Sequence, residues 1–259
     1  MNTQASLELH GKRALVTGAS SGIGLSIARS MHAQGATVLA TDISMGRLSE
    51  AFGATPAIEC VASDLSKRAE VETLLRAAGP IDILVNNAGI QHVSPIESFD
   101  PKKWDLILEI MLTAPFTLIR ALLPGMYERQ WGRILNVASV HGLIASPFKS
   151  AYVSAKHGML GLTKTVALEA GARCPNITVN AICPSYVRTP LVEKQIADQA
   201  KAHGIPESEV VERVMLTQNA IKRLIEPDEV AALCLFLCRP EAWSITGSAQ
   251  TMDAGWLAH

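Results

Sequence analysis

Short apolar runs alternate with longer amphipathic stretches along this 259-residue chain, and no other feature restricts its fold as much. The apolar runs have the length of strands and little polar alternation, which is typical of strands buried on both faces. The stretches between them have the length and periodicity of helices. Such repetition predicts an α/β protein with a doubly wound parallel sheet. The expected strands are 13–17, 36–40, 58–61, 81–85, 133–137, 177–181 and 249–252, and the expected helices are 24–34, 67–78, 102–112, 116–128, 150–172 and 227–237.

One region breaks this rhythm. Residues 184–226 contain no strand pattern but two charged helical stretches, 192–202 and 207–216. An insertion of this length before the last strand is either a lid over a site or a subunit contact. A lid is favoured because the insertion follows the carboxyl end of a strand, where such sheets bind ligands. We therefore expect one domain over 1–259, with a helical lid at about 188–220.

The charge balance points to a small-molecule partner. The formal net charge is -1, without a basic block or an acidic tail, which argues against nucleic acid or an anionic membrane. The polar segment Met1–His10 lacks the apolar run of a signal peptide, and no later segment is expected to span a membrane, so a cytoplasmic protein is predicted. Five scattered cysteines predict neither a disulfide framework nor a metal site.

A glycine-rich turn, Thr17–Gly24, follows the first expected strand and opens a helix. This is the context that a dinucleotide-binding fingerprint requires. Gly18, Gly22 and Gly24 would let the backbone approach a pyrophosphate, and the helix start at Ser21–Ile23 would offer it N–H groups. The alternative is an ordinary tight turn.

Carboxylates and amides follow the next strands at the same edge of the sheet. Asp42 ends the second strand, where it can accept hydrogen bonds from ribose hydroxyls and repel a 2'-phosphate, so NAD is favoured over NADP. Arg47 could bind a phosphate but is expected on a solvated helix. Asp64-Leu65 and Asn86–Gly89 follow the third and fourth strands, where they contact the nucleotide or only shape turns.

Tyr152 and Lys156 are four residues apart in an expected helix, which places both side chains on one face. The ammonium group would favour the phenolate form of the tyrosine. Because an unperturbed phenol titrates near pH ~10, the lysine and a positively charged nicotinamide would both be needed for work at neutral pH. The alternative is a chance pair on an amphipathic helix.

Together, Thr17–Gly24, Asn86–Gly89, Ser139, Tyr152, Lys156 and Pro184–Thr189 resemble the short-chain dehydrogenase/reductase family over nearly the full length. The resemblance implies a Rossmann fold and hydride transfer with a nicotinamide cofactor. It implies that Tyr152 exchanges a proton with the substrate oxygen, Ser139 orients that oxygen, and Lys156 holds the nicotinamide ribose. It also implies a homotetramer packed around the helices in 102–128 and 150–172. The cofactor contacts that follow are Gly18, Ser21, Gly22, Ile23, Gly24, Asp42, Asp64, Leu65, Asn87, Ala88, Gly89, Tyr152, Lys156, Pro184, Val187 and Thr189.

A closer match within the family covers 89–93, 138–143, 149–158, 189–196 and 255–257. It implies D-3-hydroxybutyrate and acetoacetate as substrates. The residues that would bind the substrate carboxylate are Gln91, His141, Lys149 and, delivered by the lid, Gln195. Lys149 would supply the cation, and Tyr186 and Trp256 would wall the methyl end beside Ser139 and Tyr152. Taken alone, Lys149 also fits a solvated loop and His141 a structural hydrogen bond.

One position departs from the family pattern. A fourth catalytic residue of the family is an Asn that supports a proton-relaying water, and the corresponding position here is Met111. A thioether cannot replace the amide, so we expect the relay to be rerouted or slow.

Two alternatives to a dehydrogenase of D-3-hydroxybutyrate remain. The chain would then be either an NAD-linked dehydrogenase of a neutral or sugar-like alcohol, or a cofactor-binding protein that has lost turnover. An NADP-dependent oxoacyl reductase is disfavoured by Asp42 and by the lack of a basic residue in 19–21.

Overall fold

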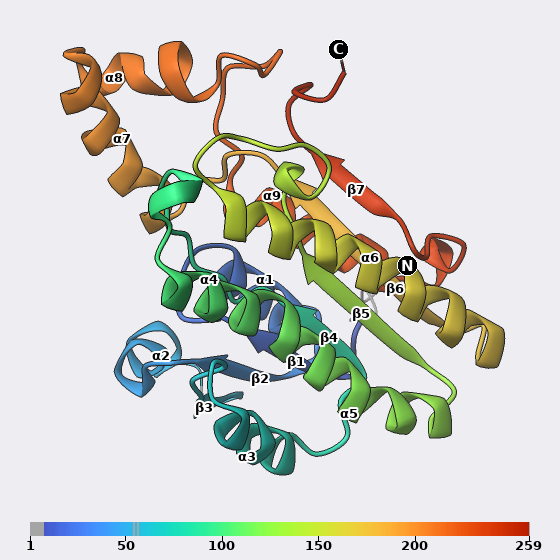
Figure 1. The fold of residues 1–259 in the computed structure, drawn as a ribbon. Helices are drawn as coiled ribbons and strands as arrows, with labels where there is room; N and C mark the ends of the chain where they lie inside the picture. The colour runs from blue at the N-terminus through green and yellow to red at the C-terminus, as the bar shows by residue number, and fades with distance from the viewer. Residues whose placement is uncertain (1–7, 54, 56, 259) are drawn as a thin grey trace.

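Seven parallel strands form one sheet in the order β3-β2-β1-β4-β5-β6-β7 in the computed structural model, which describes residues 8–53, 55 and 57–258. Both halves of the sheet begin beside β1 and β4 and grow outward, so the predicted doubly wound class is confirmed (Figure 1). The strands are β1 (Arg13–Thr17), β2 (Thr37–Asp42), β3 (Ile58–Ala62), β4 (Ile83–Asn86), β5 (Gly132–Val137), β6 (Ile177–Pro184) and β7 (Ala249–Met252).

Helices cover both faces of the sheet. Alternate residues of β1 point into two separate apolar cores: Ala14 and Val16 into one, Leu15 into the other. The first core is closed by α1 (Gly22–Ala33), α2 (Met45–Phe52) and α9 (Pro227–Cys238), and the second by α3 (Arg68–Ala78), α5 (Ala114–Glu128) and α6 (Ser150–Arg173). Burial on both sides explains why the strands read as continuous apolar runs.

The segment 101–128 is one continuous helical run. It consists of α4 (Pro101–Leu108), a π turn (Glu109–Thr113) and α5, where two separate helices were expected. By length and composition alone it is long and apolar enough to cross a membrane, a test that the core helix of a globular protein also passes, so the expectation that no segment spans a membrane stays a prediction. One face packs on the sheet and on α3 and α6, and only 39% of its most apolar window is buried within the chain. Its outer face therefore carries exposed apolar side chains such as Phe116.

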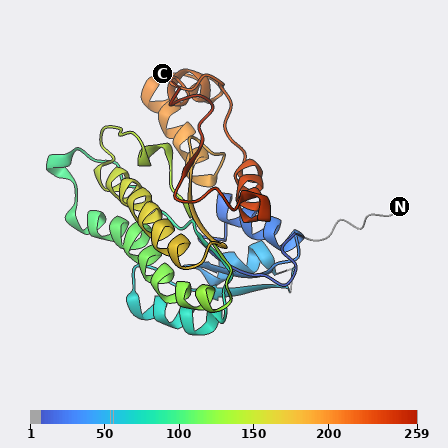
Figure 2. The ribbon, with the colours of Figure 1, turned by 90° about the vertical axis from the view of Figure 1, so that its right-hand side faces the viewer.

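Helices α7 (Pro190–His203) and α8 (Glu207–Val210) and a π turn (Val211–Met215) project beyond the rest of the molecule (Figure 2). Their base is tied together by a bridge between Val187 and Ile225, with backbone bonds of 2.8 Å from Arg188 N to Ile225 O and 3.0 Å from Ile225 N to Tyr186 O. This segment also has its own apolar cluster, which includes Val210, Met215 and Leu216. Short 3-10 turns lie at Ile96–Ser98, Val140–Gly142 and Pro240–Ala242.

Thr17, at the carboxyl end of β1, joins the turn after β1 to the turn after β4. Its buried hydroxyl accepts hydrogen bonds from Asn87 N at 2.9 Å and Ala88 N at 3.0 Å, and donates to Val85 O at 3.3 Å. The Asn87 side-chain amide returns the contact by donating to Thr17 O at 2.9 Å and Gly18 O at 3.1 Å. One hydroxyl therefore fixes the relative position of two loops.

Thr17→Val should lower the free energy of unfolding by about 2 kcal/mol, because the isosteric side chain leaves two loop N–H groups without an acceptor. Chemical denaturation measures this loss. Thr178→Val is the matched control, because its hydroxyl is buried on β6 with no hydrogen-bond partner among the described residues. An equal loss in the control would show that hydroxyl removal in general, rather than this tie, carries the effect.

Candidate active site

A cavity of about 440 Å³ lies at the carboxyl ends of the central strands. It brings together nearly all of the predicted site residues from both halves of the sheet. The predicted residues that line it are Gly18, Ser21, Gly22, Ile23, Asp42, Asp64, Leu65, Asn87, Ala88, Gly89, Gln91, Ser139, His141, Lys149, Tyr152, Lys156, Pro184, Tyr186, Val187, Thr189 and Trp256. Gly24 lies behind the turn, and Gln195 lies on α7 with a side chain outside the described part of the structure.

The glycine-rich turn at one end of the cavity fits a pyrophosphate. Gly18 and Gly22 have positive φ angles of 62° and 52°, which favour glycine. A Cβ on Gly24 would overlap the carbonyl oxygen of Gly18, so a side chain there would force the turn open. The Ser21 side chain does not cap α1, which leaves first-turn N–H groups available to an anion.

The Asp42 side chain lines the cavity where a ribose is expected, but its carboxylate already has two partners within the protein. Its carboxylate accepts 2.7 Å from Ser20 Oγ and forms a 2.9 Å ion pair with Arg47. Arg47 is solvent-exposed and on a helix as expected, and it also lines the cavity, whereas its ion pair with Asp42 was not expected from the sequence. The pair holds the Asp42 carboxylate at the cavity wall and keeps a cation beside it.

Asp64 and Leu65 follow β3 in a turn that satisfies its own polar groups. The Asp64 carboxylate accepts from the Ser66 backbone at 3.0 Å and from the Ser66 hydroxyl at 2.7 Å, and lies 3.2 Å from Lys67 Nζ. The Leu65 side chain is buried. Both residues line the cavity.

Ser139, Tyr152 and Lys156 meet at the centre of the cavity. Ser139 follows β5, and the other two lie one turn apart on α6. Lys156 Nζ donates 2.6 Å to Val137 O and lies 5.6 Å from the Tyr152 ring centroid. Burial lowers the pKa of Lys156 to about 8 and raises the pKa of Tyr152, against which a hydrogen bond from Ser139 acts. The lysine was expected to lower the pKa of Tyr152. In the protein without ligands, burial raises this pKa instead, so the phenol keeps its proton.

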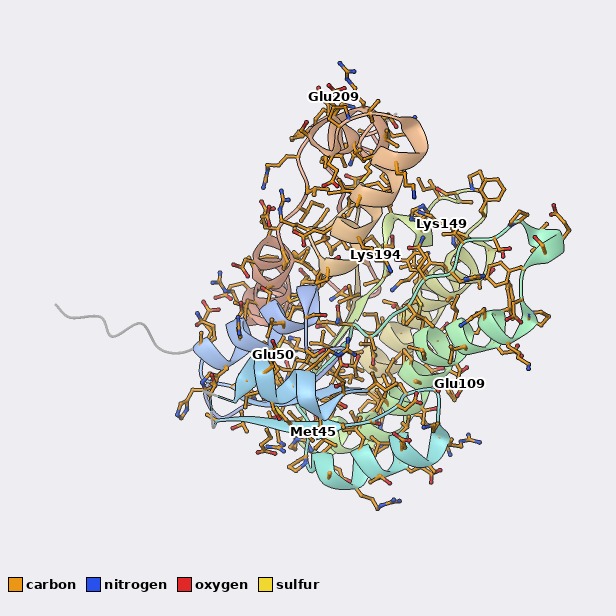
Figure 3. All side chains as sticks on the ribbon, turned by 90° about the vertical axis from the view of Figure 1, so that its left-hand side faces the viewer. Met45, Glu50, Glu109, Lys149, Lys194 and Glu209 are labelled. Carbon is orange, nitrogen blue, oxygen red and sulfur yellow. The ribbon has the colours of Figure 1, made fainter. Side chains whose placement is uncertain are left out.

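The far end of the cavity combines aromatic walls with one cation. Tyr186 and Trp256 stack with centroids 5.8 Å apart, and His141 meets Trp256 edge-on at 5.7 Å. Burial lowers the pKa of Lys149, whose ammonium group forms no ion pair among the described residues. Figure 3 shows Lys149 on the same side of the molecule as Lys194 of α7. A half-buried cation without a partner suits an anionic ligand.

His141 is held between two hydroxyl groups. Its Nδ1 lies 3.5 Å from Ser139 Oγ and its Nε2 lies 2.7 Å from Ser146 Oγ. Burial first, and then the charges of Lys149 and His157, lower the pKa of His141 to about 4, so the imidazole is neutral at pH 7. Ser146 was not among the predicted site residues, because a lone serine in a loop carries no pattern.

Met111 lies in the π turn between α4 and α5. It is fully buried and packs with Ile107, Ala151 and Ala155, close to Gly89. The sequence indicated the substitution but not the π turn that carries it. The wall beside Tyr152 on this side is therefore apolar.

This chain is similar to known proteins in both sequence and structure. The family model described as short chain dehydrogenase matches residues 12–200. Two relatives named D-beta-hydroxybutyrate dehydrogenase, from Cupriavidus necator and Rhizobium meliloti, are each 46% identical, over 96% and 95% of this chain and 99% of their own length. A crystal structure of a variant of actinorhodin polyketide ketoreductase with NADPH has a TM-score of 0.87 at 32% identity, covering 96% of this chain and 98% of its own.

The buried neutral His141 should make stability depend on pH. Its folded pKa of about 4 lies below the unfolded value, so its contribution is present above pH ~6.5 and is lost as the pH falls toward 4. Between pH 7 and 5 the wild-type protein should lose about 2 kcal/mol more unfolding free energy than His141→Gln. Urea denaturation at the two pH values measures the difference. Equal losses would mean that His141 is protonated without cost in the folded state.

Proposed function

The chain belongs to the short-chain dehydrogenase family, as its motifs predicted, and from this premise we propose that it is an NAD-dependent oxidoreductase that interconverts D-3-hydroxybutyrate and acetoacetate. The observation that carries the substrate class is Lys149, a half-buried cation in the same cavity as Tyr152 and without an ion-pair partner among the described residues. A carboxylate of the substrate would complete this pair. The 46% identity to the two named relatives supports the same assignment.

Both ligands would lie in the cavity at the carboxyl edge of the sheet. The nucleotide would lie across the glycine-rich turn, with its ribose at Asp42 and its nicotinamide end near Lys156, Val187 and Thr189. When bound, it supplies or accepts the hydride. NAD is proposed because the Asp42 carboxylate would repel a 2'-phosphate. Arg47 is already paired with that carboxylate at 2.9 Å.

The residues of the chain would handle the proton and the charge. Ser139 and Tyr152 would hydrogen-bond the reacting oxygen, and the phenol of Tyr152, which keeps its proton in the buried site, would be the proton donor in the reduction of the ketone. Lys149, Gln91 and His141 would bind the carboxylate. Tyr186 and Trp256 would confine a short methyl end. The segment 188–220 would act as a lid that brings Gln195 and excludes water.

A cytoplasmic homotetramer is part of the same proposal. The exposed side chains of Phe116 on α5 and Leu168 on α6 give this helical layer apolar positions that a second subunit would cover. The balanced charge of the chain supports a small molecule, rather than nucleic acid or a membrane, as its other partner.

The direct test is the loss of NADH absorbance with acetoacetate, beside NADPH and beside a neutral ketone of similar size. We expect fast turnover only with NADH and acetoacetate. Turnover only with the neutral ketone would exclude the carboxylate site. The absence of turnover with every substrate, together with retained nucleotide binding, would favour a non-catalytic protein and point to Met111 as the cause.

Lys149→Ala should raise the KM for acetoacetate about 10- to 100-fold with a smaller effect on kcat, because a charge-assisted contact of about 1.5–3 kcal/mol is lost. Steady-state kinetics measures both constants. Lys164→Ala is the control, because this lysine is exposed on the same helix and does not line the cavity. An unchanged KM for Lys149→Ala would show that Lys149 does not bind the carboxylate of the substrate.

A further inference from the structure

Two aromatic rings form a wall at the far end of the cavity, and each ring is carried by a loop. Tyr186 follows β6, and Trp256 follows β7. The rings stack with centroids 5.8 Å apart and planes 9° from parallel, and both line the cavity. Because neither ring lies on a helix or a strand, the position of this aromatic wall depends on the contacts that hold the two loops.

Asn219, near the end of the segment 188–220, joins these two loops. It is 2% exposed and is not among the residues that line the cavity. Its side-chain Nδ2 donates 2.6 Å to Asp253 O and 3.2 Å to Ser185 Oγ. A backbone oxygen only accepts, so the amide nitrogen must face Asp253. One buried side chain therefore ties the residue before Tyr186 to the turn that carries Trp256.

Asp253 extends this tie to Trp256. Its backbone oxygen also accepts from Trp256 N at 3.1 Å. Its carboxylate accepts from Gly255 N at 3.2 Å and from Leu257 N at 2.8 Å. Trp256 and the residues on both sides of it thus donate their N–H groups to one residue. The indole ring cannot move far unless some of these bonds break.

The turn after β7 holds two residues in the left-handed region. Ala254 has a φ of 53°, which residues other than glycine seldom adopt, and Gly255 follows with a φ of 82°. Ala254 O accepts from Ile221 N at 3.1 Å, and a Cβ on Gly255 would lie 2.8 Å from the Cβ of Ala220. Contacts from the residues that follow Asn219 therefore hold this turn in its strained conformation.

We propose that Asn219 is a positioning residue that limits the length of the apolar end of the substrate. The inference rests on the proposed function, in which the aromatic wall confines the methyl group of acetoacetate. The Asn219 amide fixes both loops that carry the wall, so the wall does not yield to a longer chain. Among 3-oxo acids, the site would therefore take acetoacetate and reject those with additional methylene groups at the apolar end.

The test compares acetoacetate with 3-oxopentanoate, which has one more methylene group at this end. A pocket of fixed shape discriminates one methylene group about 10- to 200-fold. We expect wild type to prefer acetoacetate at least about 10-fold in kcat/KM, and Asn219→Leu to prefer it less than about 3-fold. The change should lie mainly in the two KM values, because the catalytic groups are untouched.

Gln218→Leu is the matched control, because it makes the same kind of change at the next position. Gln218 is exposed and is not among the residues that line the cavity. The preference for acetoacetate should equal that of wild type in this variant. A loss as large as that in Asn219→Leu would overturn the inference, because an effect on the segment in general would then explain the result.

A double variant shows whether Asn219 acts through Trp256. In Trp256→Ala the aromatic wall is already lost, so adding Asn219→Leu should leave the preference unchanged. A further loss of the same size would overturn the inference. If Asn219→Leu does not fold, Asp253→Asn takes its place, because it removes one carboxylate oxygen from the N–H groups beside Trp256 and should also lower the preference.

The two levels of the proposal fail in different ways. Equal use of the two acids by wild type, or a preference unchanged by Asn219→Leu in an enzyme active on acetoacetate, would overturn the role of Asn219 alone. A wild type inactive toward both acids would overturn the proposed function, and the role of Asn219 with it.

Discussion

The close contact between the turn after β1 and the end of β4 is the constraint on which the rest of the structure depends. These two strands lie side by side at the centre of the sheet, where its two halves begin. Thr17 and Asn87 lock the two turns together through reciprocal hydrogen bonds, and Gly24 permits the approach because it has no Cβ. The locked turns form the floor of the cavity, so both the nucleotide end and the substrate end are positioned by contacts within the scaffold.

Burial decides the electrostatics of the site. The ring of His141 and the ammonium groups of Lys149 and Lys156 all have lowered pKa values, and burial is the main cause in each case. The same burial raises the pKa of the Tyr152 phenol. Burial thus shifts the pKa of each of these four groups toward its neutral form, while Lys156, with a pKa of about 8, still carries its proton at pH 7. A bound carboxylate and a charged nicotinamide would each change this balance, which couples ligand binding to proton transfer.

Much of this could be predicted from the sequence because strong local patterns coincide with the global fold. All seven strands are within a few residues of their expected positions, and the glycine turn, Ser139, Tyr152 and Lys156 converge on one cavity as their motifs indicated. The missed features have weak local patterns. Helix α2 is only eight residues long and contains Gly46, so its periodicity is short. The π turn at Glu109–Thr113 and the approach of Arg47 to Asp42 depend on tertiary packing, and the Ser146 contact depends on where a loop returns.

The tie between Val187 and Ile225 has a consequence for how such a protein can change over evolution. Val187 and Ile225 pair with each other at the two ends of the segment that contains α7 and α8. The length and side chains of this segment can therefore vary while the sheet stays intact. The apolar cluster that includes Val210, Met215 and Leu216 gives this segment a small core of its own. Ser139, Tyr152 and Lys156 lie outside this segment. New selectivity can therefore arise by exchanging one module, without rebuilding the catalytic framework beneath.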